Sequence, residues 1–199
     1  VCNNDEQRIF SFRTSIGYLM HTLVGKIDTK AVIAVDEELT DIDRPEGGTG
    51  KKVFIDGVKQ LRVVTHIDGK RYKPTSQFGN QQITLDTEII WIDDVKTGFP
   101  FDELHSALVE GFSIEKKGKD LYKSNPLKCY ITSNYAIPGE GNTNERRQHF
   151  IEFGNYYSKR ESVKDVHGCT FYDEEEWDED EWNRFYTYML NSVKLYFIN

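Results

Sequence analysis

EGGTGKK, residues 46–52, follows the apolar run AVIAV (31–35) and opens a segment with helical periodicity at 51–61. A glycine-rich loop between a strand and a helix is the context that a phosphate-binding loop requires. Its glycines let backbone N–H groups turn toward phosphate oxygens, and the helix N-terminus adds partial positive charge. The loop therefore predicts six nucleotide-binding residues: Gly47, Gly48, Thr49, Gly50, Lys51 and Lys52.

The loop departs from the pattern G-x-x-x-x-G-K-[ST] at two positions. Pro45 stands where the first glycine is expected, and Lys52 stands where a serine or threonine would ligate magnesium. Lys51 keeps its place and is expected to reach the β- and γ-phosphates. Taken alone, the loop fits a plain glycine turn equally well.

IIWIDD, residues 89–94, is an apolar strand that delivers two carboxylates at its carboxyl end. This is the pattern of a Walker B segment. Asp93 is expected to hold a magnesium ion, directly or through water, and Asp94 to orient and deprotonate the attacking water. A strand followed by an Asp-rich turn is the alternative.

Two weaker motifs follow along the chain. CYITSN (129–134) ends an apolar strand in Asn134, whose amide could bind the γ-phosphate or position water beside Asp94. Arg146 and Arg147 are candidates for an arginine finger that completes the site of a neighbouring subunit. Surface salt bridges are the alternative role for these arginines.

SIEKKGKDLYK (113–123) predicts a β-hairpin around Lys117-Gly118-Lys119. Basic residues beside an aromatic ring can follow a phosphate backbone and stack on bases. Lys116, Lys117 and Lys119, called the hairpin lysines below, are therefore candidate DNA-binding residues. Lysines that block edge pairing at a solvated hairpin tip are the alternative. The run 70–73, KRYK, is a second basic cluster.

Apolar runs alternate with amphipathic segments along the chain, and this predicts an α/β fold. The expected architecture is a three-layer P-loop domain with a mainly parallel five-stranded sheet, a β-hairpin insertion and flanking helices. The expected strands are 31–35, 62–67, 88–92, 128–134 and 149–153. The expected helices are 6–24, 51–61, 101–112 and 181–197. In such sheets the ligand lies beyond the carboxyl ends of the strands. We expect an N-terminal helical segment (1–30), an ATPase core (31–155) and a C-terminal acidic loop and helix that pack on the core (156–199).

Composition places few limits on the partner. The 199 residues carry a net charge of -8, but residues 173–181, DEEEWDEDE, hold eight acids, and the remaining 25 acids balance 25 bases. The acidic block is expected to be a solvated loop and the first turn of a helix. No apolar run is long enough for a membrane span. Three isolated cysteines favour a reducing, cytoplasmic setting. The start VCNNDEQR, without Met, suggests a piece of a larger protein.

The order of these motifs carries more information than any one of them. The stretches PEGGTGKKVF, TEIIWIDDVK, ITSNYAIPGEG and NERRQHFIEF resemble the superfamily three helicases, AAA+ ATPases of small viruses, phages and plasmids. More narrowly, the chain resembles the C-terminal ATPase region of phage or mobile-element primase–helicase proteins of Bacteroides-type bacteria. The resemblance spans residues 6–199.

The resemblance implies a function and a set of partners. ATP, with Mg²⁺, would lie between subunits of a homo-oligomeric ring, expected to be hexameric in the full-length protein, and a β-hairpin would project into the pore toward single-stranded or forked DNA. Lys51 would contact phosphate, Asp93 and Asp94 would be the Walker B acids, and Asn134 would be the first sensor. The hairpin lysines would lie on the pore hairpin, and Arg146 or Arg147 would be the finger.

Three functions remain open at this stage. The first is an ATP-dependent DNA helicase or translocase domain of a replication protein. The second is a degenerate AAA+ module for nucleotide binding or oligomerisation without robust ATPase activity, which Pro45 and Lys52 favour. The third is another P-loop enzyme such as a small-molecule kinase. The basic hairpin lies between the Walker B strand and the strand that ends in Asn134, and this position argues against a kinase.

Overall fold

The structure is a computed structural model that describes residues 2–23, 25, 29–37, 48–137, 141–157 and 162–199. Its strands are β1 (Ala31–Asp36), β2 (Val64–Asp68), β3 (Ile89–Val95), β4 (Ser113–Ile114), β5 (Tyr122–Lys123), β6 (Lys128–Ser133) and β7 (Gln148–Phe153). Its helices are α1 (Glu6–Met20), α2 (Lys51–Lys59), the 3₁₀ helix η1 (Phe101–Leu104), α3 (His105–Glu110), α4 (Asn142–Arg147), α5 (Val163–His167) and α6 (Glu179–Ile198).

Five strands form one parallel sheet in the order β2-β3-β6-β1-β7. Because all five run the same way, their carboxyl ends meet at one edge of the sheet. β4 and β5 pair separately as an antiparallel hairpin. The predicted α/β class, the parallel five-stranded sheet and the hairpin insertion are therefore confirmed.

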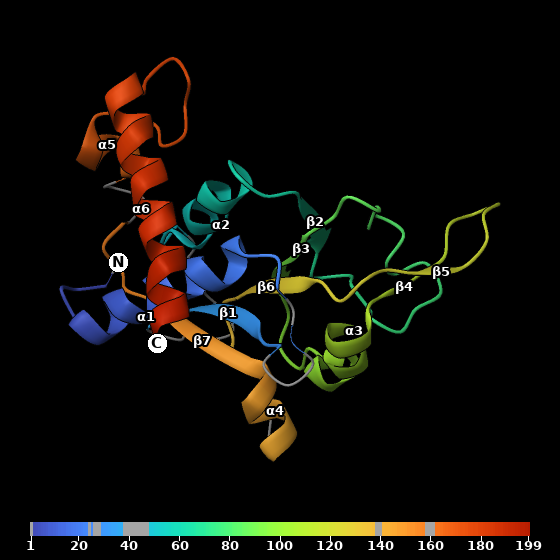
Figure 1. Cartoon of the computed structure of the whole chain (residues 1–199). Helices are drawn as coiled ribbons and strands as arrows, with labels where there is room; N and C mark the ends of the chain where they lie inside the picture. The colour runs from blue at the N-terminus through green and yellow to red at the C-terminus, as the bar shows by residue number, and fades with distance from the viewer. Residues whose placement is uncertain (1, 24, 26–28, 38–47, 138–140, 158–161) are drawn as a thin grey trace.

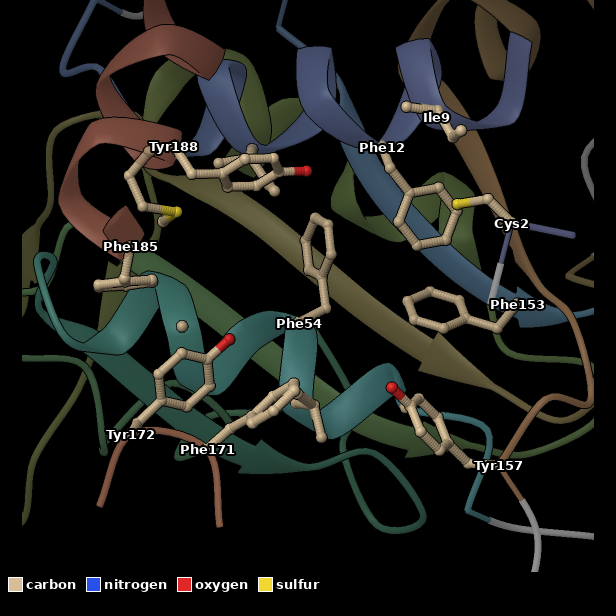
Figure 2. A pocket seen from close by; sticks show the side chains of 15 residues that line it. Cys2, Ile9, Phe12, Phe54, Phe153, Tyr157, Phe171, Tyr172, Phe185 and Tyr188 are labelled. Carbon is tan, nitrogen blue, oxygen red and sulfur yellow. The ribbon is translucent and has the colours of Figure 1, made fainter. Parts of the chain in front are cut away.

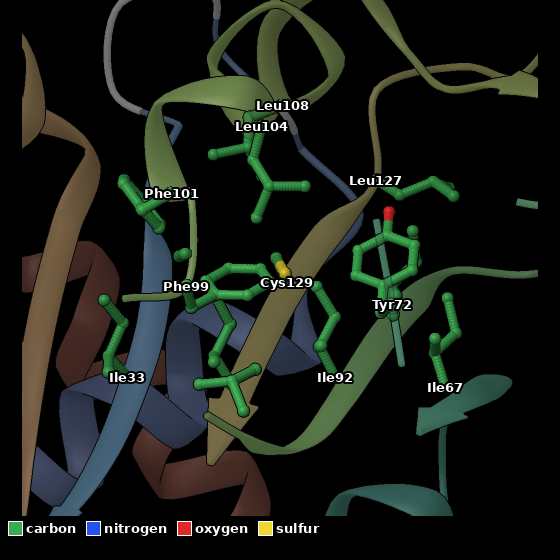
Figure 3. Packing of buried hydrophobic residues seen from close by; sticks show 14 of the residues in the cluster. Ile33, Ile67, Tyr72, Ile92, Phe99, Phe101, Leu104, Leu108, Leu127 and Cys129 are labelled. Carbon is green, nitrogen blue, oxygen red and sulfur yellow. The ribbon is translucent and has the colours of Figure 1, made fainter. Parts of the chain in front are cut away.

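Both faces of the central strands β3, β6 and β1 are covered, which explains why these strands read as continuous apolar runs, whereas the edge strands β2 and β7 are only partly buried. In β1, Ile33 packs toward the face covered by η1 and α3, whereas Val32 packs toward α1, α2 and α6. Figure 3 shows the first of these two clusters, where the rings of Phe99 and Tyr72 lie beside the aliphatic side chains. Because successive side chains of a strand point to opposite faces, one apolar run contributes to the hydrophobic cores on both faces of the sheet.

Helix α6 stands along α1 on the outside of the molecule (Figure 1). The two helices approach closely at Gly17, where an added Cβ would lie 2.2 Å from the carbonyl oxygen of Ser192. The side chain of Asp178 caps α6 by accepting from the Glu181 N–H at 2.8 Å, and three acids follow in the first turn. This confirms the helix-start interpretation of the acidic block.

Lys128, at the start of β6, is a buried ionisable residue with only 2% of its surface exposed. Its Nζ donates to the carbonyl of Tyr18 and lies 2.9 Å from Nδ1 of His21, and it sits 4.3 Å from the centre of the Tyr18 ring. Burial, followed by the nearby Arg62, lowers the pKa of Lys128 to about 7. Burial also lowers the pKa of His21 to about 4.

The helix boundaries differ from the prediction in places. α1 ends at Met20 rather than at residue 24, since His21 is extended, and the segment 101–112 divides into η1 and α3. Helices α4 and α5 were not predicted, because segments this short and polar have no apolar periodicity. None of the helices in the described ranges is long and apolar enough to cross a membrane. The division into three regions stays a prediction.

Candidate functional site

The glycine-rich loop joins α2 through two glycines in the left-handed region. Gly48 has φ 109° and Gly50 has φ 105°, a conformation that side chains with a Cβ rarely adopt. The helix begins directly at Lys51, so its first N–H groups face the same space as the loop. Gly47, predicted to bind nucleotide, and Pro45 lie outside the described residues.

Lys51 is held by two oxygen atoms from neighbouring strands. Its Nζ donates to Oδ2 of Asp36 at 2.5 Å and to Oδ1 of Asn134 at 2.8 Å. Asp36 ends β1 and is 5% exposed, and its second oxygen accepts from the Thr49 hydroxyl at 2.6 Å. The lysine is therefore fixed beside the loop before any ligand arrives.

Asp93 and Asp94 line the same cleft although they are consecutive residues of a strand. Consecutive side chains normally point to opposite faces. Here the pairing of β3 with β6 is irregular between Ile92 and Val95, and Asp94 has φ 55°. The Thr132 hydroxyl holds the bulge: it donates to Oδ1 of Asp93 at 2.6 Å and accepts from the Asp94 N–H at 2.8 Å. The bulge therefore turns the Asp94 carboxylate to the side of the sheet on which the Asp93 carboxylate lies.

Asn134 connects the loop lysine to the second acid. Its carbonyl oxygen accepts from Lys51, and its Nδ2 donates to Oδ1 of Asp94 at 3.1 Å. Three segments that are far apart in sequence thus meet at the carboxyl edge of the sheet, where the predicted site was expected.

These side chains surround one cleft of about 330 Å³, within the size range of small-molecule sites. The structure brings eight of the predicted residues to it: Gly48, Thr49, Gly50, Lys51, Lys52, Asp93, Asp94 and Asn134. Val53, Thr132 and Val163 complete the lining.

Lys52 borders the cleft but its ammonium turns away. Its side chain is 72% exposed and pairs with Asp56 at 2.5 Å, one turn along α2. The hydroxyl expected at this position is therefore missing from the cleft, while Thr49 and Thr132 supply hydroxyls from elsewhere. Within the described residues, no three His, Cys, Asp or Glu side chains gather as a metal cluster. Mg²⁺ commonly takes one or two carboxylates and several phosphate or water oxygens, so the Asp93 carboxylate fits such an ion.

The predicted arginines lie at the other end of the sheet. Arg147 precedes Gln148, which pairs with Ala31 at the start of β1, so about 20 Å of strand separates α4 from Asp36. Figure 1 shows α4 beyond β7, far from α2. Arg146 is exposed, whereas the half-buried Arg147 donates to the Thr29 carbonyl at 2.9 Å. Neither arginine can therefore reach the cleft of its own chain.

The hairpin projects from the body as a long arm (Figure 1). Lys117 and Lys119 are exposed in its loop, and Lys116 is half-buried. The structure places all three away from the cleft, as the resemblance implied.

Three residues of the site were not found in the sequence. Asp36 follows the apolar run AVIAV (31–35) just as Asp93 follows an apolar run, but it belongs to none of the predicted motifs. Lys70, after β2, pairs with Oδ2 of Asp94 at 2.6 Å, and Nε2 of His66 lies 3.3 Å from Oδ2 of Asp93. A polar residue directly after an apolar run is the signal that would have found Asp36, whereas Lys70 and His66 join the site only through their side-chain pairing with Asp94 and Asp93.

A glycine loop at a helix N-terminus, paired acids at the carboxyl end of another strand and a parallel sheet define the P-loop class of nucleotide-binding folds. Among solved structures, the chain is similar to the apo C-terminal region of NrS-1, with a TM-score of 0.55 and 17% identity over 96% of this chain. A JCV helicase structure matches 76% of this chain at 13% identity, with a TM-score of 0.47.

These likenesses concern the fold alone. The chain spans 40% of the length of the NrS-1 structure and 46% of that of the JCV helicase. No protein-family profile matches the sequence, and no curated protein matches it.

Proposed function

We propose that this chain is an ATP-hydrolysing domain of a DNA helicase or translocase that works as a ring, in a replication protein of a phage or mobile element. The observation that carries the proposal is the single cleft in which Lys51, Asp94 and Asn134 meet through direct hydrogen bonds. Lys51 would neutralise phosphate charge, and Asp94 would take a proton from the attacking water that Asn134 helps to orient. Mg²⁺, next to Asp93, would offset charge on the phosphate oxygens.

An apolar pocket beside the cleft supports a nucleoside triphosphate rather than a smaller anion. Gly50 and Val53 line both spaces, and the pocket has a volume of about 260 Å³. Aromatic side chains from α1, α2 and α6 surround it, together with those of Phe153, Tyr157, Phe171 and Tyr172 (Figure 2). A planar base is a suitable occupant, because stacking on aromatic rings is worth about 1–3 kcal/mol per base.

Replacing Tyr188 tests this pocket. Tyr188 lines the pocket and is 45% exposed, while Tyr186, two residues away on the same helix, is 40% exposed and lies outside the pocket. Tyr188→Ala should weaken ATP binding at least fivefold and leave tripolyphosphate binding unchanged, whereas Tyr186→Ala should alter neither. Equal ATP affinities for the two variants would place the base elsewhere.

The decisive experiment measures ATP turnover with and without single-stranded DNA. We expect turnover that DNA stimulates, and we expect Lys51→Ala to remove ATP binding from a folded chain. Arg146→Ala should bind ATP but not hydrolyse it, and mixing it with Lys51→Ala should restore part of the activity at interfaces that keep both groups. Mixed oligomers without recovered activity would contradict an arginine that acts on a neighbour.

A degenerate module that binds nucleotide without turnover is the second candidate. The outward-turned Lys52 and the pairing of Lys51 with the buried Asp36 favour it, because both reduce the groups available to phosphate and metal. Measurable ATP affinity in titrations, with no turnover under any DNA condition, would support this alternative.

A further inference from the structure

A second cleft, of about 390 Å³, lies beside the nucleotide cleft, between the segment after β2 and the turn after β3. Four basic residues line it: Lys70, Arg71, Lys73 and Lys96. Glu103 is its one acidic lining residue, and it accepts from the Thr75 hydroxyl at 2.9 Å. The sequence indicated the first three cations as a cluster, but only the fold adds Lys96 to them.

Most of this positive charge lacks a counter-charge. Lys70 pairs with Asp94, but Arg71, Lys73 and Lys96 are exposed and form no ion pair with any residue that the structure describes. Like charges that gather in one concave site repel each other and raise the local concentration of anions. Outside the acidic block at 173–181 the acids and bases of the chain balance, so this gathering is a local excess of positive charge.

The cleft rests on a fixed floor. Tyr72 and Phe99 are buried beneath it, and the Tyr72 hydroxyl donates to Asn80 at 2.8 Å. The Gly69 N–H donates to the Asp93 carbonyl at 2.7 Å, and a Cβ at Gly69 would lie 2.5 Å from that oxygen. Close backbone contact with β3 therefore positions the cations before a ligand binds.

We propose that this cleft binds the phosphodiester backbone of a single-stranded nucleic acid. The two floor rings are buried and cannot stack on bases, so contacts to phosphate without sequence preference are expected. The segment that carries Lys73 continues to the base of the hairpin, where Gln77 donates to Glu115 at 2.7 Å and Asn80 donates to the Ser113 carbonyl at 3.0 Å. One strand can thus follow this segment from the cleft toward the hairpin lysines. That the ligand is a nucleic-acid strand rests on the proposed function, whereas the positive charge of the cleft does not.

The test measures binding of a fluorescent oligothymidylate to the whole chain by anisotropy, without nucleotide, over a series of salt concentrations. The variant Arg71→Ala/Lys96→Ala removes two unpaired charges. Lys194→Glu, at an exposed position of α6, changes the net charge by the same two units and is the matched control. Each lost contact lowers the slope of log affinity against log salt by about 0.7 for single strands. We expect the double variant to lose about 1.4 in slope and about 25-fold in affinity at 0.1 M salt.

Two results would overturn the cleft as a strand site. If Lys194→Glu lost as much oligonucleotide affinity and slope as the double variant, the effect would come from the net charge of the chain and not from the cleft. An unchanged slope in the double variant, with calorimetric binding of inorganic phosphate lost from it, would assign the cleft to a free phosphate instead.

ATP-analogue binding by the same proteins separates this inference from the proposed function. If no protein binds the analogue but the double variant still loses the oligonucleotide, the nucleotide proposal fails and the cleft stands. If the wild type and the double variant both bind the analogue and have the same salt slope for the oligonucleotide, only the proposal for the cleft fails.

Discussion

Replacing Lys128 by methionine should stabilise the chain, and the gain should shrink as the pH rises. Folding lowers the pKa of Lys128 from 10.5 to about 7, chiefly through burial. The unfolded chain keeps this proton up to about pH 10.5, so unfolding takes up a proton between the two values. The free energy of unfolding of the wild type therefore rises with pH in this window. Below pH 7 both states are protonated, and the cost of the buried charge is complete.

The magnitude follows from the two pKa values. One pKa unit corresponds to 1.36 kcal/mol, so the cost below pH 7 has an upper limit of about 5 kcal/mol. Methionine also leaves the Tyr18 carbonyl without its donor, which costs about 1–3 kcal/mol at every pH. The net gain at pH 7 is thus about 1–3 kcal/mol, and it falls by about 2.3 kcal/mol between pH 7 and pH 9.

Urea unfolding at both pH values, followed by tryptophan fluorescence, measures this difference. Groups that titrate in both proteins cancel when the wild type is subtracted from the variant. Lys194→Met, at an exposed position, is the control and should show no pH-dependent difference. A stability difference for Lys128→Met that is equal at pH 7 and pH 9 would refute the reasoning, because it would mean that Lys128 stays charged in the folded chain.

Three further outcomes are expected. Asp94→Asn should keep ATP affinity and stop turnover, while Asp93→Asn should weaken the magnesium dependence of ATP binding; identical kinetics would contradict their separate roles. Changing all three hairpin lysines to alanine should lower the salt slope of single-stranded DNA binding by roughly 2 and spare ATP binding, so an unaltered slope would exclude the hairpin. Gly17→Ala should lower the free energy of unfolding in urea by about 1–3 kcal/mol, because its Cβ would meet the Ser192 carbonyl at 2.2 Å. A neutral result would show that α1 and α6 separate easily.

The sequence predicted the sheet well because burial on both faces leaves a direct trace. Runs such as AVIAV and EIIWI have no polar alternation, and only a covered parallel sheet accommodates several of them. The helix α4 left no such trace, since NTNERR buries no residue.

The candidate site was predictable where a residue's place in the chain fixes its place in space. Lys51, Asp93 and Asn134 each follow an apolar strand or loop, so the fold class alone brings them to one edge. Lys70 and the bulge at Asp94 depend on side-chain pairing and on one unusual backbone angle. Nothing in the local sequence specifies either, because both arise from the contact between neighbouring strands.

The placement of Arg146 bears on how the protein would behave in a cell. A solitary chain presents the proposed nucleotide cleft at one edge of its sheet and an arginine about 20 Å away at the opposite edge. In an enzyme built this way, dilution alone would stop turnover while every chain remained folded and loaded. A defective copy would also silence the healthy chain beside it. An arginine variant produced together with the normal protein should therefore lower the turnover of mixed rings, with one neighbouring site lost for each variant chain.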